Sequence, residues 1–180
     1  NNYAKLSEEA LALWAELLGA LPEATIVFKG KAFTHDERRK RVLKRFSDVG
    51  VSVQRIRFLG MTSWKEHMAA LSDVDIALDP FPYVGGISTL EALWMGVPVV
   101  TLKGVAMSNR ISAAILNVAD LIDWIAETPQ QYLEIARHKA CSIDELKTLR
   151  QTLRGRLRAS PIMDPQVYVR AVETVYRQIW

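Results

Sequence analysis

The sequence has little cysteine and no long apolar run. Its one cysteine, Cys141, excludes an internal disulfide and any metal site built from several cysteines. No apolar stretch reaches the ~18 residues that a membrane-spanning helix needs, and the N-terminal residues lack the basic-then-apolar pattern of a secretory signal. We therefore expect a cytoplasmic protein that has no membrane partner and needs no metal or other cofactor.

Internal repeats, low-complexity segments and linkers are also missing. With 180 residues, of which 49% are hydrophobic, residues 1–180 are expected to form a single domain. Basic residues form two groups: Arg38, Arg39, Lys40, Arg41, Lys44 and Arg45, then Arg150, Arg154, Arg156 and Arg158. Both groups lie on predicted amphipathic helices, without a zinc-finger, RNP or basic-zipper pattern. We interpret them as solvated helix faces and expect no nucleic-acid partner.

Short apolar segments alternate with amphipathic segments along most of the chain. The expected strands are 25–28, 56–59, 74–78 and 98–102, and residues 116–127 are ambiguous, with a strand or turn near Leu121. The expected helices start at Ser7, Thr34, Ser63, Ser88 and Ser108. This alternation predicts an α/β fold: a Rossmann-like open parallel sheet with helices on both faces.

Helix starts are indicated by capping residues. A serine or threonine followed three residues later by glutamate is typical of a capping box. The pairs are Thr34 with Glu37, Ser63 with Glu66, Ser88 with Glu91 and Ser142 with Glu145. Helices from about residue 129 to 180 have no strand between them, and we expect them to pack on the sheet as a layer. The last is predicted to bury a stripe of Tyr168, Ala171, Val175 and Ile179.

The stretch LDPFPYVGGISTLEALWMGVPVVTLKG, residues 78–104, reads as strand, glycine loop, helix and strand. Gly85 and Gly86 let backbone approach a ligand closely, and the unpaired N–H groups of a helix start suit a phosphate. Ligands of an open parallel sheet bind beyond the carboxyl ends of its strands. That edge comprises residues 29–30, 60–63, 80–88 and 103–108. On pattern alone, an ordinary βαβ turn is an equally good interpretation.

Three segments carry a resemblance: LDPFPYVGG, EALWMGVPVVTL and SNRISAAIL. Together they resemble the nucleotide-sugar half of GT-B glycosyltransferases, and more closely glycosyltransferase family 41, which contains O-linked N-acetylglucosamine transferases and Spindly-type O-fucosyltransferases. The resemblance implies the C-terminal, donor-binding half of a GT-B enzyme that uses a UDP- or GDP-sugar. It also implies partners outside these residues: an N-terminal catalytic half, TPR repeats and a protein acceptor.

The resemblance assigns roles along the predicted edge. It places the diphosphate near Lys5, Gly85, Gly86, Ile87, Ser88 and Thr89. Glu91 matches an acidic position for the ribose, and a carboxylate can accept both ribose hydroxyls, although capping competes for the same side chain. Met61, Thr62 and His67 match the segment beside the base, and Arg110 matches a family arginine whose alternative role is an ion pair.

The chain departs from the family at several of these positions. Ile87 stands where threonine is usual, Gly86 where the animal enzymes have histidine, and Trp64 where they have lysine. Tyr83 stands eight residues before Glu91, where retaining GT-B enzymes carry a second glutamate, which favours an inverting mechanism. No catalytic base is evident, so the catalytic residues are unknown. A nucleotide-binding module without activity and another GT-B-like sugar-nucleotide enzyme remain alternatives.

Overall fold

The computed structural model describes residues 2–180, so Asn1, which the resemblance pairs with Lys5, lies outside the described residues. Strand β1 (Ile26–Lys29) pairs in parallel with β2 (Ile56–Leu59). Strand β4 (Val99–Leu102) lies between β3 (Ala77–Leu78) and β5 (Ile125–Ala126), again in parallel. The predicted parallel α/β fold is confirmed, although the strands within residues 2–180 form two separate sheets, β1–β2 and β3–β4–β5, rather than one.

The third strand is shorter than the predicted 74–78. Val74 donates its N–H to Leu71 and its carbonyl accepts from Arg150. Because both groups serve the turn after the preceding helix, the ladder begins only at Ala77, whose N–H donates to Pro98.

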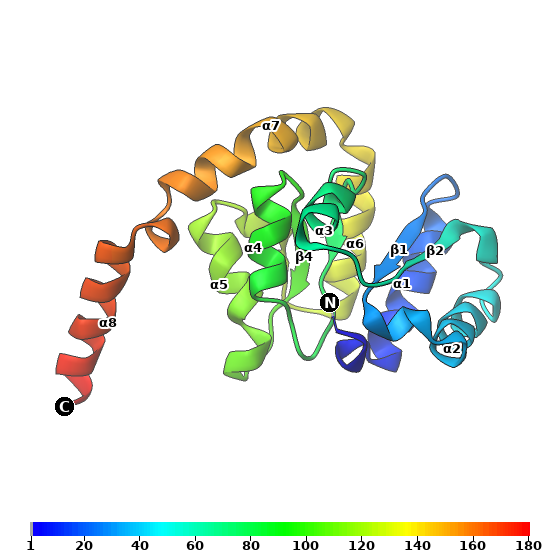
Figure 1. The fold of residues 1–180 in the computed structure, drawn as a ribbon, viewed down its shortest axis with the longest axis horizontal. Helices are drawn as coiled ribbons and strands as arrows, with labels where there is room; N and C mark the ends of the chain where they lie inside the picture. The colour runs from blue at the N-terminus through cyan, green and yellow to red at the C-terminus, as the bar shows by residue number, and fades with distance from the viewer. Residues whose placement is uncertain (1) are drawn as a thin grey trace.

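Helices cover both sides of the strands. Their bounds are α1 Glu8–Ala20, α2 Asp36–Ser47, α3 Trp64–Leu71, α4 Ile87–Trp94, α5 Ile111–Val118, α6 Pro129–Cys141, α7 Ile143–Ala159 and α8 Pro165–Ile179. Figure 1 shows α4 and α5 on one side of β4 and α6 on the other, while α1 and α2 accompany β1 and β2. A single cluster of buried apolar residues extends from α1 through the strands to α7.

Some predicted caps are confirmed. Ser7 accepts the N–H of Ala10 at the start of α1, and Ser63 with Glu66 forms a complete capping box at α3. Besides these, α6 begins with proline at its first position, and Thr128 before it accepts the N–H of Gln131.

Other predicted caps are wrong because their side chains have other partners. The Thr34 hydroxyl donates to the Lys31 carbonyl, and His35 rather than Thr34 precedes α2. At α7, Ser142 makes no side-chain cap bond, and Glu145 pairs with Lys139.

The two basic groups differ. Most of the α2 group is solvated as predicted and pairs with surface carboxylates, for instance Lys44 with Asp48, while Arg39 and Arg45 are half-buried. In α7, however, Arg150 donates to carbonyls of Leu71, Val74 and Met95, and Arg154 Nε donates to the Trp94 carbonyl at 2.7 Å. These carbonyls lie at the ends of α3 and α4. The solvated-face interpretation is therefore wrong for Arg150, which is half-buried, whereas Arg154 stays exposed as predicted and adds one contact to the end of α4.

The predicted buried stripe of the last helix is wrong as well. None of the α8 residues is buried: Tyr168, Val175 and Ile179 are 61%, 54% and 72% exposed. Figure 1 shows α8 extending away from the strands beyond the end of α7. The layer over the strands therefore comprises α6, which packs on β4 and β5, and α7, which packs on α4 and α6.

Candidate functional site

The structure brings the two predicted ligand-binding segments together. His67, on the first turns of α3, places Nε2 at 3.3 Å from Oε2 of Glu91 on α4. Both side chains are partly exposed, at 33% and 25%. Since α3 follows β2 and α4 follows β3, the contact joins the carboxyl ends of the two parallel sheets. An imidazole and a carboxylate at such an edge can bind a polar, uncharged ligand group.

The buried side chain of Asp79 fixes the glycine loop in place. It follows β3 and is 2% exposed. Oδ1 accepts the Gly85 N–H at 2.8 Å, and Oδ2 accepts the Thr101 hydroxyl at 2.8 Å. Burial raises the pKa of Asp79, because removal from water disfavours the charged carboxylate, while hydroxyl and N–H donors act in the opposite direction.

A second layer of polar contacts supports Asp79 itself. Its backbone carbonyl accepts from the Tyr132 hydroxyl at 3.1 Å, and Trp14 Nε1 donates to the same hydroxyl at 3.1 Å. Tyr132 is buried, which raises its pKa well above its usual value. The loop is therefore fixed from α6 and α1, so its backbone groups are held in position before any ligand arrives.

The N-terminal segment reaches the same loop. Lys5 Nζ donates to the Val84 carbonyl at 2.9 Å and lies 4.4 Å from the centre of the Tyr83 ring. Ser7 donates its hydroxyl to the Phe81 carbonyl at 2.6 Å while it caps α1. An ammonium group thus sits beside the loop, as an anion site requires.

The start of α4 differs from its predicted form. The helix begins at Ile87 with Gly86 before it and no side-chain cap bond, so the predicted Ser88–Glu91 capping box is wrong. Glu91 contacts His67 instead. Ile87 is 76% exposed at the first helical position. Thr89 is buried and its hydroxyl lies 2.8 Å from that of Ser112, so this side chain faces the interior rather than the edge.

The remaining predicted residues surround these groups. Thr62 accepts from Lys29 Nζ at 2.8 Å, which ties the loop after β2 to the end of β1. Met61 and Trp64 are 69% and 71% exposed beside it. Arg110 precedes α5 with an exposed side chain, and no ion pair involves it within residues 2–180, so its predicted alternative role is not observed.

The buried polar residues that fix the glycine loop were not predicted from the sequence. Asp79, Thr101 and Ser112 come from three separate segments, and Tyr132 from a fourth. Only Asp79 carried a usable signal, because a charged residue directly after an apolar strand and before a glycine loop usually has a specific partner. No group of carboxylate, histidine or cysteine side chains in the described chain could hold a metal ion, and no described helix is long and apolar enough to cross a membrane.

The parallel strands, the covering helices and the loop edge define a Rossmann-like half of a GT-B glycosyltransferase. The family model for glycosyl transferase family 41 matches residues 1–172, and the chain belongs to this family.

Individual proteins agree with the family. SPINDLY of Solanum lycopersicum is 35% identical over all of this chain, which spans 19% of that protein. A UDP-N-acetylglucosamine–peptide N-acetylglucosaminyltransferase of Caenorhabditis elegans is 25% identical, with 15% of its length spanned. A mutant O-GlcNAc transferase of Thermobaculum terrenum superposes with a TM-score of 0.92 at 33% identity, covering all of this chain and 35% of the other. The chain therefore spans about a fifth of its curated relatives.

Proposed function

We propose that this chain is the donor-binding domain of an inverting protein O-glycosyltransferase and binds the diphosphate and nucleoside of a UDP- or GDP-sugar. The observation that carries the proposal is the convergence of Lys5, the glycine loop and the His67–Glu91 pair at one edge. Family membership supplies the reaction class, and this edge supplies a place for the donor.

The diphosphate is assigned to the loop between β3 and α4. The first N–H groups of α4 have no acceptor within the helix and attract negative charge. Lys5 adds a cation beside them. Ser88 is the hydroxyl candidate in this turn, while Thr89 contributes through its place in the helix rather than through its buried hydroxyl.

The nucleoside is assigned to the space between α3 and α4. Glu91 is not used as a cap, so its carboxylate can accept the ribose hydroxyls. His67 lies against it, and the exposed Met61 and Thr62 follow β2 where the base would lie. We also infer that the chain up to α7 is one domain, since a single apolar cluster runs through it.

The acceptor and the catalytic base are assigned to parts of the protein outside these residues. Relatives are about five times as long as this chain, and inverting displacement needs an acceptor hydroxyl aligned behind the anomeric carbon. That alignment contributes up to ~7–11 kcal/mol in favourable cases. An N-terminal catalytic half, TPR repeats and an intracellular protein acceptor are therefore part of the proposal.

One observation favours a second function. Ile87 at the start of α4 and Trp64 at the start of α3 are both highly exposed and apolar, at positions where the family usually has threonine and the animal enzymes have lysine. A module that holds a nucleotide weakly and transfers no sugar is the second candidate.

The test is a screen of UDP, GDP and their sugars by ligand-induced change in melting temperature, because a ligand that binds the native state stabilises it. A nucleoside diphosphate should raise the melting temperature of the wild type. Lys5→Met should weaken its affinity about tenfold, since one charge-assisted contact is lost. Lys147→Met is the matched control on α7. Absence of any shift, or equal affinities of the two variants, would refute the assignment. The chain alone should transfer no radiolabelled sugar to a peptide mixture.

A further inference from the structure

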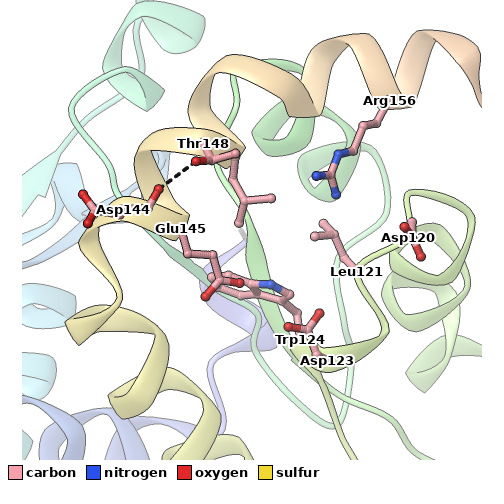
Figure 2. A pocket seen from close by; sticks show the side chains of 9 residues that line it. Asp120, Leu121, Asp123, Trp124, Asp144, Glu145, Thr148 and Arg156 are labelled. Carbon is pink, nitrogen blue, oxygen red and sulfur yellow. Dashed lines mark hydrogen bonds between the residues drawn. The ribbon is translucent and has the colours of Figure 1, made fainter.

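Lys29 and Glu66 are two charged side chains at the carboxyl edge that have no ion pair within residues 2–180. Charged groups in other parts of the molecule are committed to each other. In the hollow before β5, which Figure 2 shows, the carboxylates of Asp123 and Glu145 both pair with Lys139. The unpaired groups beside the proposed nucleoside site are therefore the stronger candidates for contact with a ligand.

The ammonium group of Lys29 is held against the loop that follows β2. Its Nζ donates to Thr62 Oγ1 at 2.8 Å and lies 3.5 Å from the carbonyl oxygen of Gly60. An ammonium group has three N–H donors and no acceptor. Two of them point to these oxygens, and the third has no acceptor in the part of the chain that the structure describes. Lys29 therefore presents a donor, and only a donor, beside the segment assigned to the base.

The carboxylate of Glu66 is held next to the same loop. Its Oε2 accepts the Ser63 N–H at 2.9 Å and the Ser63 hydroxyl at 2.8 Å, while Oε1 has no partner within the described residues. The hydroxyl and the N–H of Ser63 lower the pKa of Glu66, and the charge of Lys29 lowers it further. Thr62 and Ser63, which hold the two groups, are consecutive residues, so a charged donor and a charged acceptor lie close together.

Nucleobases differ in the pair of groups that they would present to this donor and acceptor. Uracil and guanine each have an oxo group, which accepts, next to a ring N–H, which donates. Cytosine and adenine have an amino group, which donates, next to a ring nitrogen that accepts. An ammonium beside a carboxylate complements the first arrangement. It opposes the second, because two donors would face each other and two acceptors would face each other.

We propose that Lys29 and Glu66 select the base of the donor nucleotide. Lys29 donates to O4 of uracil or O6 of guanine, and Oε1 of Glu66 accepts the adjacent ring N–H. The inference rests on the function proposed above, in which Glu91 takes the ribose and the loop after β2 lies beside the base. It adds a substrate class to that function: nucleoside diphosphates with an oxo base bind, and those with an amino base are rejected.

The experiment titrates the chain with UDP, CDP, GDP and ADP by calorimetry. UDP and CDP differ only in the group at position 4 and in the protonation of the adjacent ring nitrogen, so they isolate the proposed contacts. UDP should bind at least roughly tenfold more tightly than CDP, and GDP roughly tenfold more tightly than ADP. Equal affinities of UDP and CDP would overturn this inference and leave the nucleotide site in place. Absence of binding by all four would overturn the proposed function as well.

The matched variants are Lys29→Met and Lys31→Met. Lys31 is exposed, lies two residues further along, and makes no side-chain hydrogen bond within residues 2–180. Lys29→Met should bring the ratio of UDP to CDP affinity close to one, and Lys31→Met should keep the wild-type ratio. Glu66→Gln should lower the ratio too, because an amide can cap α3 as the carboxylate does but presents an N–H to the base. Each ratio is measured within one protein, so a general loss of charge or stability does not change it. Equal ratios for Lys29→Met and Lys31→Met would refute the role of Lys29.

Discussion

Adding one methyl group at Gly85 should damage the loop, whereas the same change at Gly86 should not. A Cβ at Gly85 would lie 2.4 Å from Thr89 Oγ1, 2.9 Å from Asp79 Oδ1 and 3.0 Å from Ser88 Oγ. A Cβ at Gly86 would meet only Ile111 Cγ2, at an ordinary 3.6 Å. The two glycines are adjacent, so Gly86→Ala is a close control for Gly85→Ala.

The cost at Gly85 follows from what its neighbours are already doing. Thr89 Oγ1 cannot turn away freely, because it is paired with Ser112, and Asp79 Oδ1 accepts the Gly85 N–H. Overpacking of this kind costs ~1–3 kcal/mol, and loss of a hydrogen bond to a charged group costs ~1.5–3 kcal/mol. Because moving the loop relieves one cost by incurring the other, we expect a loss of about 3 kcal/mol in the free energy of unfolding.

Urea unfolding of the wild type and both alanine variants measures this loss, with the slope checked for two-state behaviour. Gly86→Ala should lie within ~1 kcal/mol of the wild type. Calorimetry below the unfolding transition then reports nucleoside diphosphate affinity, which should fall for Gly85→Ala. A Gly85→Ala protein as stable as the wild type would refute the loop geometry. If Gly85→Ala loses stability as expected but keeps the affinity of the wild type, the phosphates do not bind at this loop.

The remaining predictions concern Ile87, Asp79 and α8. Ile87→Thr should tighten UDP or GDP binding by roughly 1–3 kcal/mol, because it adds a charge-assisted hydrogen bond at the start of α4; unchanged affinity by calorimetry would count against the phosphate assignment. Since the pKa of Asp79 is raised above its usual 3.8, its contribution to stability is present at low pH and is lost as pH rises through the folded pKa. Urea midpoints should therefore fall from pH 4 upward relative to Asp79→Asn, and a parallel pH dependence of the two proteins would exclude the effect. A chain that ends at Asp164 should unfold within ~0.5 kcal/mol of the full chain, since α8 buries no residue; a larger loss would show that α8 packs on the domain.

Local patterns predicted several elements of the fold correctly. The strand 56–59 has the predicted bounds, and Ser63 with Glu66 forms the predicted capping box. The arrangement of loops along the carboxyl edge could be predicted too, because parallel strands bring their ends to the same side. The pattern at Ser142 failed, because Glu145 has a stronger partner in Lys139, which comes from another helix.

Helix α8 shows what hydrophobic periodicity cannot predict. The 3.6-residue period identified which face of α8 is apolar, but not what covers it, and in residues 2–180 nothing does. Likewise, both α2 and α7 carry a group of basic residues, and the sequence alone does not separate the two groups. Only the packing of α7 across the ends of α3 and α4 distinguishes Arg150 from a solvated residue.

The predicted Ser88–Glu91 capping box is wrong, and this affects the role that Glu91 can have in ligand binding. The sequence left two roles competing for its carboxylate, capping of α4 and ribose binding. The helix begins at Ile87, so Glu91 is the fifth residue of α4, two positions beyond the third, from which a glutamate reaches back to the backbone of the cap. Its carboxylate instead lies against His67 of α3, partly exposed at the edge. Because Glu91 does not cap α4, its carboxylate is available to a ligand. We assign it to the ligand because it lies at the carboxyl edge, on the helix that follows the glycine loop.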